Sequence, residues 1–100
     1  MTTMTIKDYI VKFNDYAKAG DAVFFDSCPL IDTGETIVFD MTGLDGVSTV
    51  FLNTSFGHLM DVYGIERVKK SFKFTNILRT QAERIKKYFQ DYAEVKATQA

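Results

Sequence analysis

The stretch Thr36-Ile37-Val38-Phe39-Asp40-Met41 decides the fold, because it is a short run rich in β-branched and apolar residues. It follows Asp32-Thr33-Gly34-Glu35, whose Gly and Asp content predicts a turn. The run is continuously apolar rather than strictly alternating, so we expect a strand that is buried on both faces. Strands of this kind occupy the middle of parallel sheets, and the sequence therefore predicts a central parallel strand here.

Strands and helices alternate on both sides of this strand. Pro29 should kink or end the helix that precedes it, and Gly64 should end the helix that follows it. The last helix should begin at a capping box, Thr80-Gln81-Ala82-Glu83. In chain order, the expected elements are a short strand within 3–9, a turn at 14–15, a helix over 22–31, the strand 36–41, a loop over 42–46, a helix over 51–63, a helical piece over 65–71, a strand at 72–74 and a final helix. In the final helix, Ala82, Ile85, Tyr88, Phe89 and Tyr92 should face inward. Its residues Arg84, Lys87 and Asp91 should face water.

This alternation is typical of an α/β domain, in which right-handed crossovers make neighbouring strands mostly parallel. We expect a sheet of three or four strands with helices packed mainly on one face. Residues 1–95 should form one domain, and residues 96–100 should be a disordered tail because they have nothing to bury.

Composition excludes several classes of protein. The 100 residues are 46% hydrophobic, which suits a single core. The chain begins without a basic region followed by an apolar run, and it has no stretch approaching the roughly 18–20 apolar residues of a membrane span, so we expect a soluble cytoplasmic protein. With one cysteine, Cys28, and one histidine, it can form neither an internal disulfide nor a cysteine–histidine zinc site. No metal or cofactor is expected, and Cys28 should lie reduced in or near the core.

Charge is distributed unevenly along the chain. Residues 1–66 carry a net charge of −7 and residues 67–100 a net charge of +6. The start of the basic half defines a basic surface of Arg67, Lys69, Lys70 and Lys73. Such a run is most often a solvated face, and an acidic protein partner is the next reading. Nucleic acid ranks last because the nearby aromatic residues have core spacing, and head-to-tail self-association into a homo-oligomer stays open.

The helix expected over 51–63 has two unlike sides, because each residue advances by about 100° around a helix. The apolar side consists of Phe51, Leu52, Ser55, Phe56, Leu59, Met60, Val62 and Tyr63. The other side, near the helix start, has only small or hydrogen-bonding residues: Ser48, Thr49, Asn53, Thr54, Gly57 and His58. Such a surface admits close backbone approach, and we predict that it binds a partner.

Two catalytic or metal-binding interpretations receive less support. Cys28 and His58 are formally a nucleophile and a base, but Cys28 lies at the end of an apolar helix and nothing orients His58. Asp40 and Asp45 flank the loop before the 51–63 helix, and Asp21 opens the first helix; paired carboxylates can bind Mg²⁺, but spacing places no third ligand beside a pair. We expect Asp40 to bind loop amides at the strand end and Asp21 to lie at a helix start. The sequence therefore predicts a protein that is not an enzyme.

An ordered set of short motifs resembles a known family. The signature is Val47-Ser48-Thr49, Phe51-Leu52-Asn53 and Phe56-Gly57-His58-Leu59. The flanking matches are Ile6-Lys7-Asp8-Tyr9-Ile10, Gly20-Asp21-Ala22-Val23-Phe24, Gly34-Glu35-Thr36-Ile37-Val38-Phe39-Asp40, Gly43-Leu44, Phe74-Thr75-Asn76 and Lys86-Lys87-Tyr88-Phe89. Together they resemble the STAS-like family, a bacterial and phage group distantly related to anti-sigma-factor antagonists, over residues 5–92.

The resemblance implies a regulatory protein–protein interaction module. In the related antagonists, a hydroxyl at a helix start is phosphorylated by a partner of the histidine-kinase ATPase fold. Val50 stands where many relatives have Ser or Thr, which leaves Thr49 and Ser48 as the candidate phosphorylation sites. The alternative is a phage-type inhibitor or defence-system accessory that binds a host protein through its charged surfaces. Ser48 and Thr49 also suit a plain helix N-cap.

Overall fold

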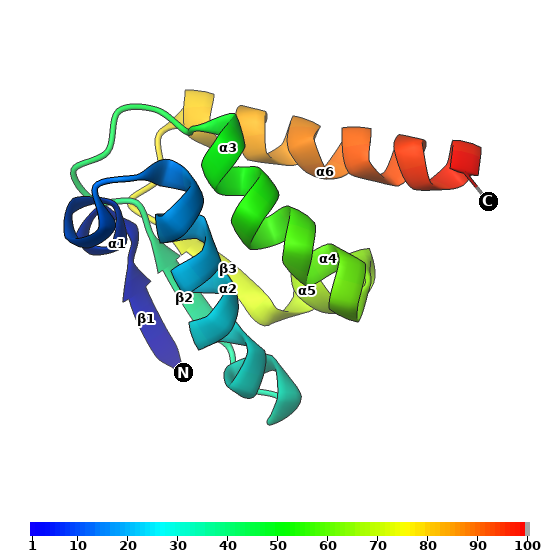
Figure 1. Ribbon diagram of the computed structural model, residues 1–100, viewed down its shortest axis with the longest axis horizontal. Coiled ribbons are helices and arrows are strands. Elements are labelled where there is room, and N and C mark those ends of the chain that lie inside the picture. Colours follow the sequence, from blue (N-terminus) through cyan, green and yellow to red (C-terminus); the bar gives the residue numbers. More distant parts are fainter. Residues whose placement is uncertain (100) are drawn as a thin grey trace.

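A three-stranded parallel sheet organises the computed structural model, which describes residues 1–99. The strand order is β1 (Thr2–Thr5), β2 (Ile37–Asp40) and β3 (Phe72–Thr75), with β2 in the centre (Figure 1). Residues at one level of the sheet are Met4, Phe39 and Phe74. The predicted central parallel strand and the predicted strand at 72–74 are therefore confirmed.

The sheet buries one face only. On that face Phe39 is fully buried and packs against the rings of Phe72 and Phe74. The opposite face carries exposed Thr3 and Lys73, with β2 residues between them only half-buried. The expectation that β2 is buried on both faces is wrong, because both crossovers carry their helices over the same face. The expectation that helices pack mainly on one face is confirmed.

The first crossover consists of α1 (Ile6–Phe13) and α2 (Tyr16–Asp32). The strand expected within 3–9 stops at Thr5, because Ile6 is buried on a helical face and begins α1. Asn14 makes the predicted turn with φ of 49°, a left-handed conformation that Asn tolerates. Asp15 caps α2 by accepting a hydrogen bond from the amide of Lys18 at 2.9 Å. The helix thus starts earlier than predicted, and Asp21 lies inside it rather than at its start.

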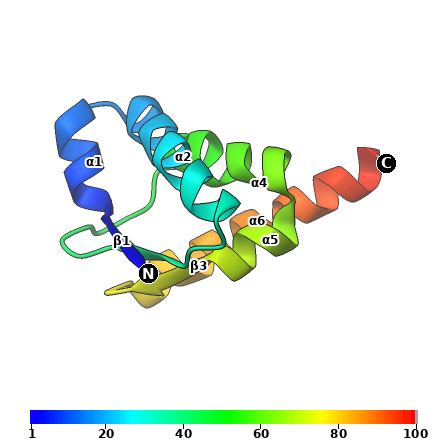
Figure 2. The same ribbon diagram turned by 90° about the horizontal axis from the view of Figure 1, so that it is seen from below.

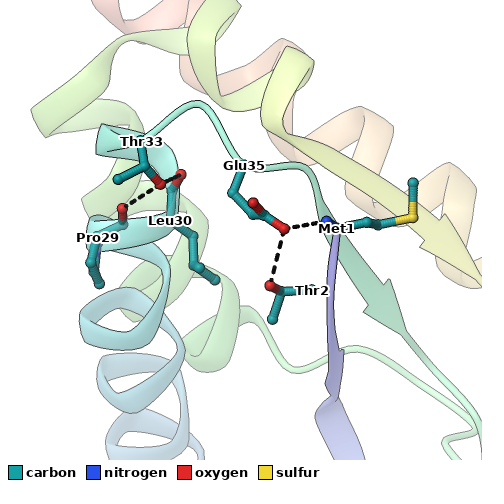
Figure 3. A network of polar contacts seen from close by, with 6 residues as sticks. All are labelled: Met1, Thr2, Pro29, Leu30, Thr33 and Glu35. Carbon is teal, nitrogen blue, oxygen red and sulfur yellow. Dashed lines mark hydrogen bonds and ion pairs between the residues drawn. The ribbon is translucent and has the colours of Figure 1, made fainter.

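A polar network ties the end of α2 to the sheet (Figure 3). α2 continues through Pro29 to Asp32, and the hydroxyl of the C-cap residue Thr33 donates to the carbonyls of Pro29 and Leu30, both at 3.1 Å. Glu35 accepts a hydrogen bond from Thr2 at 3.4 Å and forms an ion pair with the N-terminal amine. The amine holds the pKa of Glu35 below its usual value, through its hydrogen bond first and its charge second.

The second crossover is one long helix followed by a short one. The long helix runs through α3 (Thr49–Leu52), the π-helical turn η1 (Asn53–Gly57) and α4 (His58–Tyr63). Gly64, with φ of 87°, ends it as predicted, and α5 (Ile65–Ser71) follows.

The π turn corrects the predicted faces of this helix. A π turn holds one residue more than an α-helical turn, so everything after it lags by about 100°. Val62, predicted inward, is 57% exposed, and Gly57, predicted outward, is buried. The other predicted inward residues are buried or half-buried as predicted: Phe51, Leu52, Ser55, Phe56, Leu59, Met60 and Tyr63.

The final helix, α6 (Arg79–Gln99), runs along the outside of α3–α4, and its last turns project past the rest of the fold (Figures 1 and 2). It begins before the predicted capping box: Gln81, not Glu83, reaches back and accepts a hydrogen bond from the Leu78 amide at 2.9 Å. Of the residues predicted inward on α6, only Ala82 is exposed.

The predicted disordered tail over 96–100 is corrected as far as Gln99, where α6 ends. Within it, Lys96 lies 3.5 Å from a carboxylate oxygen of Asp61 and over the ring of Tyr92. Ala100 lies outside the described residues. Over residues 1–99, no helix is both long and apolar enough to cross a membrane.

Candidate functional site

The carboxyl ends of β2 and β3 are joined by Asp40. Its carboxylate accepts hydrogen bonds from the amide of Thr42 at 3.0 Å, the hydroxyl of Thr42 at 2.6 Å and the side-chain amide of Asn76 at 3.0 Å. These bonds, the hydroxyl of Thr42 first, hold the pKa of Asp40 below its usual value. The expectation that Asp40 binds loop groups at the strand end is confirmed. Nowhere in the described part of the chain do three His, Cys, Asp or Glu side chains gather in a way that could hold a metal ion.

The loop after β2 is held by two side chains of α6. Gln81, only 1% exposed, donates to the carbonyls of Leu44 at 2.8 Å and Gly46 at 3.3 Å. Arg84 donates to the carbonyl of Val47 at 2.9 Å. Arg84 is exposed as expected, and its position on α6 gave no sign of a loop partner 37 residues away. The N-terminal turns of α6 therefore set the position of the whole 44–47 loop.

The loop leads directly into the two hydroxyl residues singled out in the sequence. Ser48 is the N-cap of α3, and its hydroxyl oxygen accepts a hydrogen bond from the Phe51 amide at 3.3 Å. The predicted capping role is confirmed for Ser48. Thr49 is exposed, and its hydroxyl oxygen accepts a hydrogen bond from the guanidinium of Arg84. Val50, next along the chain, is 51% exposed.

A pocket of about 510 Å³ opens between this loop and the first crossover. It lies at the carboxyl end of the parallel strands, where ligands of α/β proteins commonly bind. Its walls are mostly apolar, with Asp45 and Ser48 as polar groups. The lining consists of Ile6 and Ile10 of α1, Tyr16 of α2, Phe39 of β2, Met41 just after β2, the loop 43–48, and Phe51 and Leu52 of α3.

Sequence reasoning found one wall of this pocket and missed the other. Ser48 and the loop before it were identified, whereas Ile6, Ile10 and Tyr16 come from the far end of the chain. A usable signal was present, because a loop that follows a central parallel strand must emerge at the carboxyl edge, next to the start of the first crossover.

The remaining predicted partner-binding residues lie against the protein's own helices. Asn53 accepts a hydrogen bond from the hydroxyl of Tyr88 at 2.8 Å, and a Cβ on Gly57 would lie 2.5 Å from the same hydroxyl oxygen. Thr54 lies against Gly20 of α2, where a Cβ would meet its hydroxyl oxygen at 1.8 Å. Of the six predicted residues, Thr49, Asn53 and His58 are exposed, Ser48 and Thr54 are half-buried and Gly57 is buried.

His58 takes a separate position on α4. Its ring stacks on Phe24 of α2 with centroids 3.6 Å apart and planes 2° from parallel. Cys28, one turn along α2 from Phe24, is half-buried as expected, and its carbonyl accepts a hydrogen bond from the Tyr63 hydroxyl at 3.2 Å. Burial and the bond to Asp32 raise the pKa of Tyr63. Cys28 therefore packs between α2 and α4, whereas His58 is an exposed residue whose ring covers Phe24.

The basic surface also divides. Arg67 donates to the carbonyl of Ile31 at 3.0 Å and lies over the ring of Tyr63, so it ties α5 to α2. Lys69 and Lys70 are exposed on α5. Lys73 is exposed on the uncovered face of β3. All four residues of the predicted basic surface are exposed, and Arg67 is the one among them that also ties α5 to α2.

These features define a class: a small parallel α/β domain with helices on one face, a parallel edge strand on each side and an apolar pocket beside a capped helix start. The chain matches the family described as a STAS-like domain of unknown function over residues 19–80, more than half of its length. It belongs to that family, as its motifs indicated. No curated protein and no solved structure matches it.

Proposed function

We propose that this chain is a non-enzymatic regulatory module that binds a partner protein at the carboxyl edge of its sheet. The observation that carries the proposal is the 510 Å³ pocket beside Ser48, whose mostly apolar walls suit a partner's hydrophobic side chain. Exposed Thr49 and Val50 stand next to it and extend the surface that a partner can contact. The absence of a gathered set of titratable groups in this pocket, where Asp45 is the one acid among the lining residues, favours binding over catalysis.

The proposed docking surface differs from the one expected from the helix alone. Ser48 and Thr49 stay within it, because Ser48 lines the pocket and Thr49 is exposed beside it. Gly57 is buried against Tyr88 of α6, so it supports the surface, whereas Asn53 is exposed although it binds the same hydroxyl. The centre of the site moves to the loop 44–48.

Thr49 is the better candidate for phosphorylation at this site. The hydroxyl of Ser48 is engaged as the N-cap and is half-buried, whereas Thr49 is exposed. A phosphate on Thr49 would meet the guanidinium of Arg84, which already binds the hydroxyl. It would add a charge of about −1.5 to −2 beside the pocket and repel an acidic partner surface. A partner of the histidine-kinase ATPase type fits this arrangement.

Val50 and Val62 provide a matched test, because they lie on one long helix and are 51% and 57% exposed. A photo-crosslinking phenylalanine analogue at position 50 should capture a partner in the native cell, and the same analogue at position 62 should not. Val50→Arg should then abolish co-purification of that partner, and Val62→Arg should leave it intact. Equal capture from both positions, or co-purification unaffected by Val50→Arg, would refute the proposed site.

The regulatory part has its own comparison. Thr49→Glu should weaken capture of the identified partner, whereas Thr49→Val, which removes the hydroxyl without adding charge, should retain it. If both variants bind as the wild type does, charge at Thr49 does not regulate docking.

A further inference from the structure

A second hollow lies on the other flank of the sheet, between β3 and α6. Its volume is about 320 Å³, and it shares no lining residue with the pocket beside the loop 44–48. The floor is apolar and the rim carries two lysines: Phe74, Ile77, Ala82, Ile85 and Phe89 below, with Lys69 and Lys86 above. We refer to these seven residues as the β3–α6 groove.

The groove adjoins an open sheet edge. Within residues 1–99, β2 is the only strand that pairs with β3. In a parallel strand, every second residue points its N–H and C=O away from its single neighbour. These groups are a template for one more strand, and an extended segment that paired there would run beside the groove.

Lysine side chains gather around this edge. Lys69, Lys70, Lys73 and Lys86 are all exposed, and none of them takes part in the ion pairs seen within the described chain. Four unpaired cations beside an apolar hollow complement an acidic segment that presents one large apolar side chain. They disfavour a second copy joined through its own β3, because Lys73 would then face Lys73.

We propose that the β3–α6 groove binds an acidic, extended peptide segment of a partner protein, which adds a strand to β3 and inserts an apolar side chain over Ile85. This surface is separate from the proposed docking site at the 44–48 loop. One protein could therefore hold two partners, or two parts of one partner, at once.

Ala82 and Ala93 offer a matched pair of variants, because both are exposed alanines on α6 and only Ala82 lines the groove. Ala82→Arg should fill the groove, whereas Ala93→Arg makes the same chemical change outside it. Arginine is a good helix former, so neither variant should disturb α6.

The probe is a phage-displayed library of random peptides, selected on the intact wild-type protein. We expect selected peptides to carry Asp or Glu on both sides of one large apolar residue. A synthetic peptide of the selected sequence should shift the amide resonances of Phe72–Thr75. Its affinity should fall by about tenfold or more with Ala82→Arg and stay unchanged with Ala93→Arg.

Three results would overturn the proposal. The first is selection without enrichment of acidic residues, and the second is peptide binding that Ala82→Arg leaves unchanged. The third is self-association of the protein that added salt and Ala82→Arg both reverse, because a second copy would then be the occupant.

Discussion

Gln81 provides a quantitative test of how α6 holds the loop beside the pocket. It accepts a hydrogen bond from the amide of Leu78 and donates to the carbonyls of Leu44 and Gly46. Each neutral hydrogen bond contributes about 1 kcal/mol, and a buried group left unpaired costs about 1–3 kcal/mol. Water can reach the loop carbonyls, since Leu44 is half-buried and Gly46 is exposed. We therefore expect Gln81→Met to lower the free energy of unfolding by about 2–3 kcal/mol.

Gln81→Glu keeps the shape of the side chain and should lower the stability of the fold in a pH-dependent way. Its second oxygen would face two carbonyl oxygens in place of a donor, and burial would raise its folded-state pKa above the unfolded value of about 4.3. Below that value the group is protonated in both states, so the variant should lie near its maximum stability. As pH rises, the unfolded state ionises first, and stability should fall by up to about 1.4 kcal/mol per pH unit until the folded-state pKa is reached.

The assay is urea unfolding followed by circular dichroism at about pH 4 and about pH 7, on either side of the unfolded pKa. Gln90, exposed on the same helix, supplies the controls Gln90→Met and Gln90→Glu, which should change stability by less than about 0.5 kcal/mol. If Gln81→Glu unfolds at the wild-type urea concentration at both pH values, Gln81 does not organise the loop.

Two further predictions concern helix packing. Gly20→Ala would place a Cβ 2.7 Å from the carbonyl oxygen of Phe51, so we expect a loss of about 1–3 kcal/mol in urea unfolding, whereas Gly46→Ala meets nothing within 4 Å and should cost less. Equal losses would contradict the close approach of α2 to the long helix. Burial, and then the hydrogen bond to Asp61, raises the pKa of Tyr92 from 10.0 to about 12. The neutral phenol is favoured in the folded state, so its contribution is fully present below pH 10.0 and is lost as pH rises through about 12. An absorbance titration, taken as the difference from Tyr92→Phe, should show a lower pKa in Asp61→Asn, and an unchanged value would contradict the assigned causes.

Local sequence patterns were sufficient where local physics decides the structure. The β-branched run at 36–41 formed the central strand, and Ser48 capped the helix that follows. Gly64 ended that helix through its positive φ. In each case the deciding interaction lies within a few residues along the chain, so a short stretch of sequence contains all the residues that cause the structure.

The carboxyl-edge site depends on contacts between distant parts of the chain. Gln81 and Arg84 reach carbonyls 35–37 residues away, and nothing in their spacing on α6 distinguishes them from solvent-facing residues. The exposed lysines gave a clear charge pattern, but the apolar hollow beside them needs Phe74 and Phe89 from two elements. The charge of the proposed partner can thus be inferred from composition, whereas the shape of the groove that would bind it cannot.

The π turn explains how the long helix α3–η1–α4 contributes residues both to the hydrophobic core and to the contact with α6 that supports the pocket. Without it, Gly57 would have stayed on the exposed side, by the regular wheel of the 51–63 helix. The added residue turns Gly57 beneath α6, where its missing side chain admits the Tyr88 hydroxyl that binds Asn53. That contact holds α6 against the long helix one turn beyond the point where Arg84 grips Thr49 and the loop. The π turn thus exposes Val62 and in return lets α6, which positions the pocket, pack against the long helix. Gly57 of the family motif is therefore needed for packing within the fold.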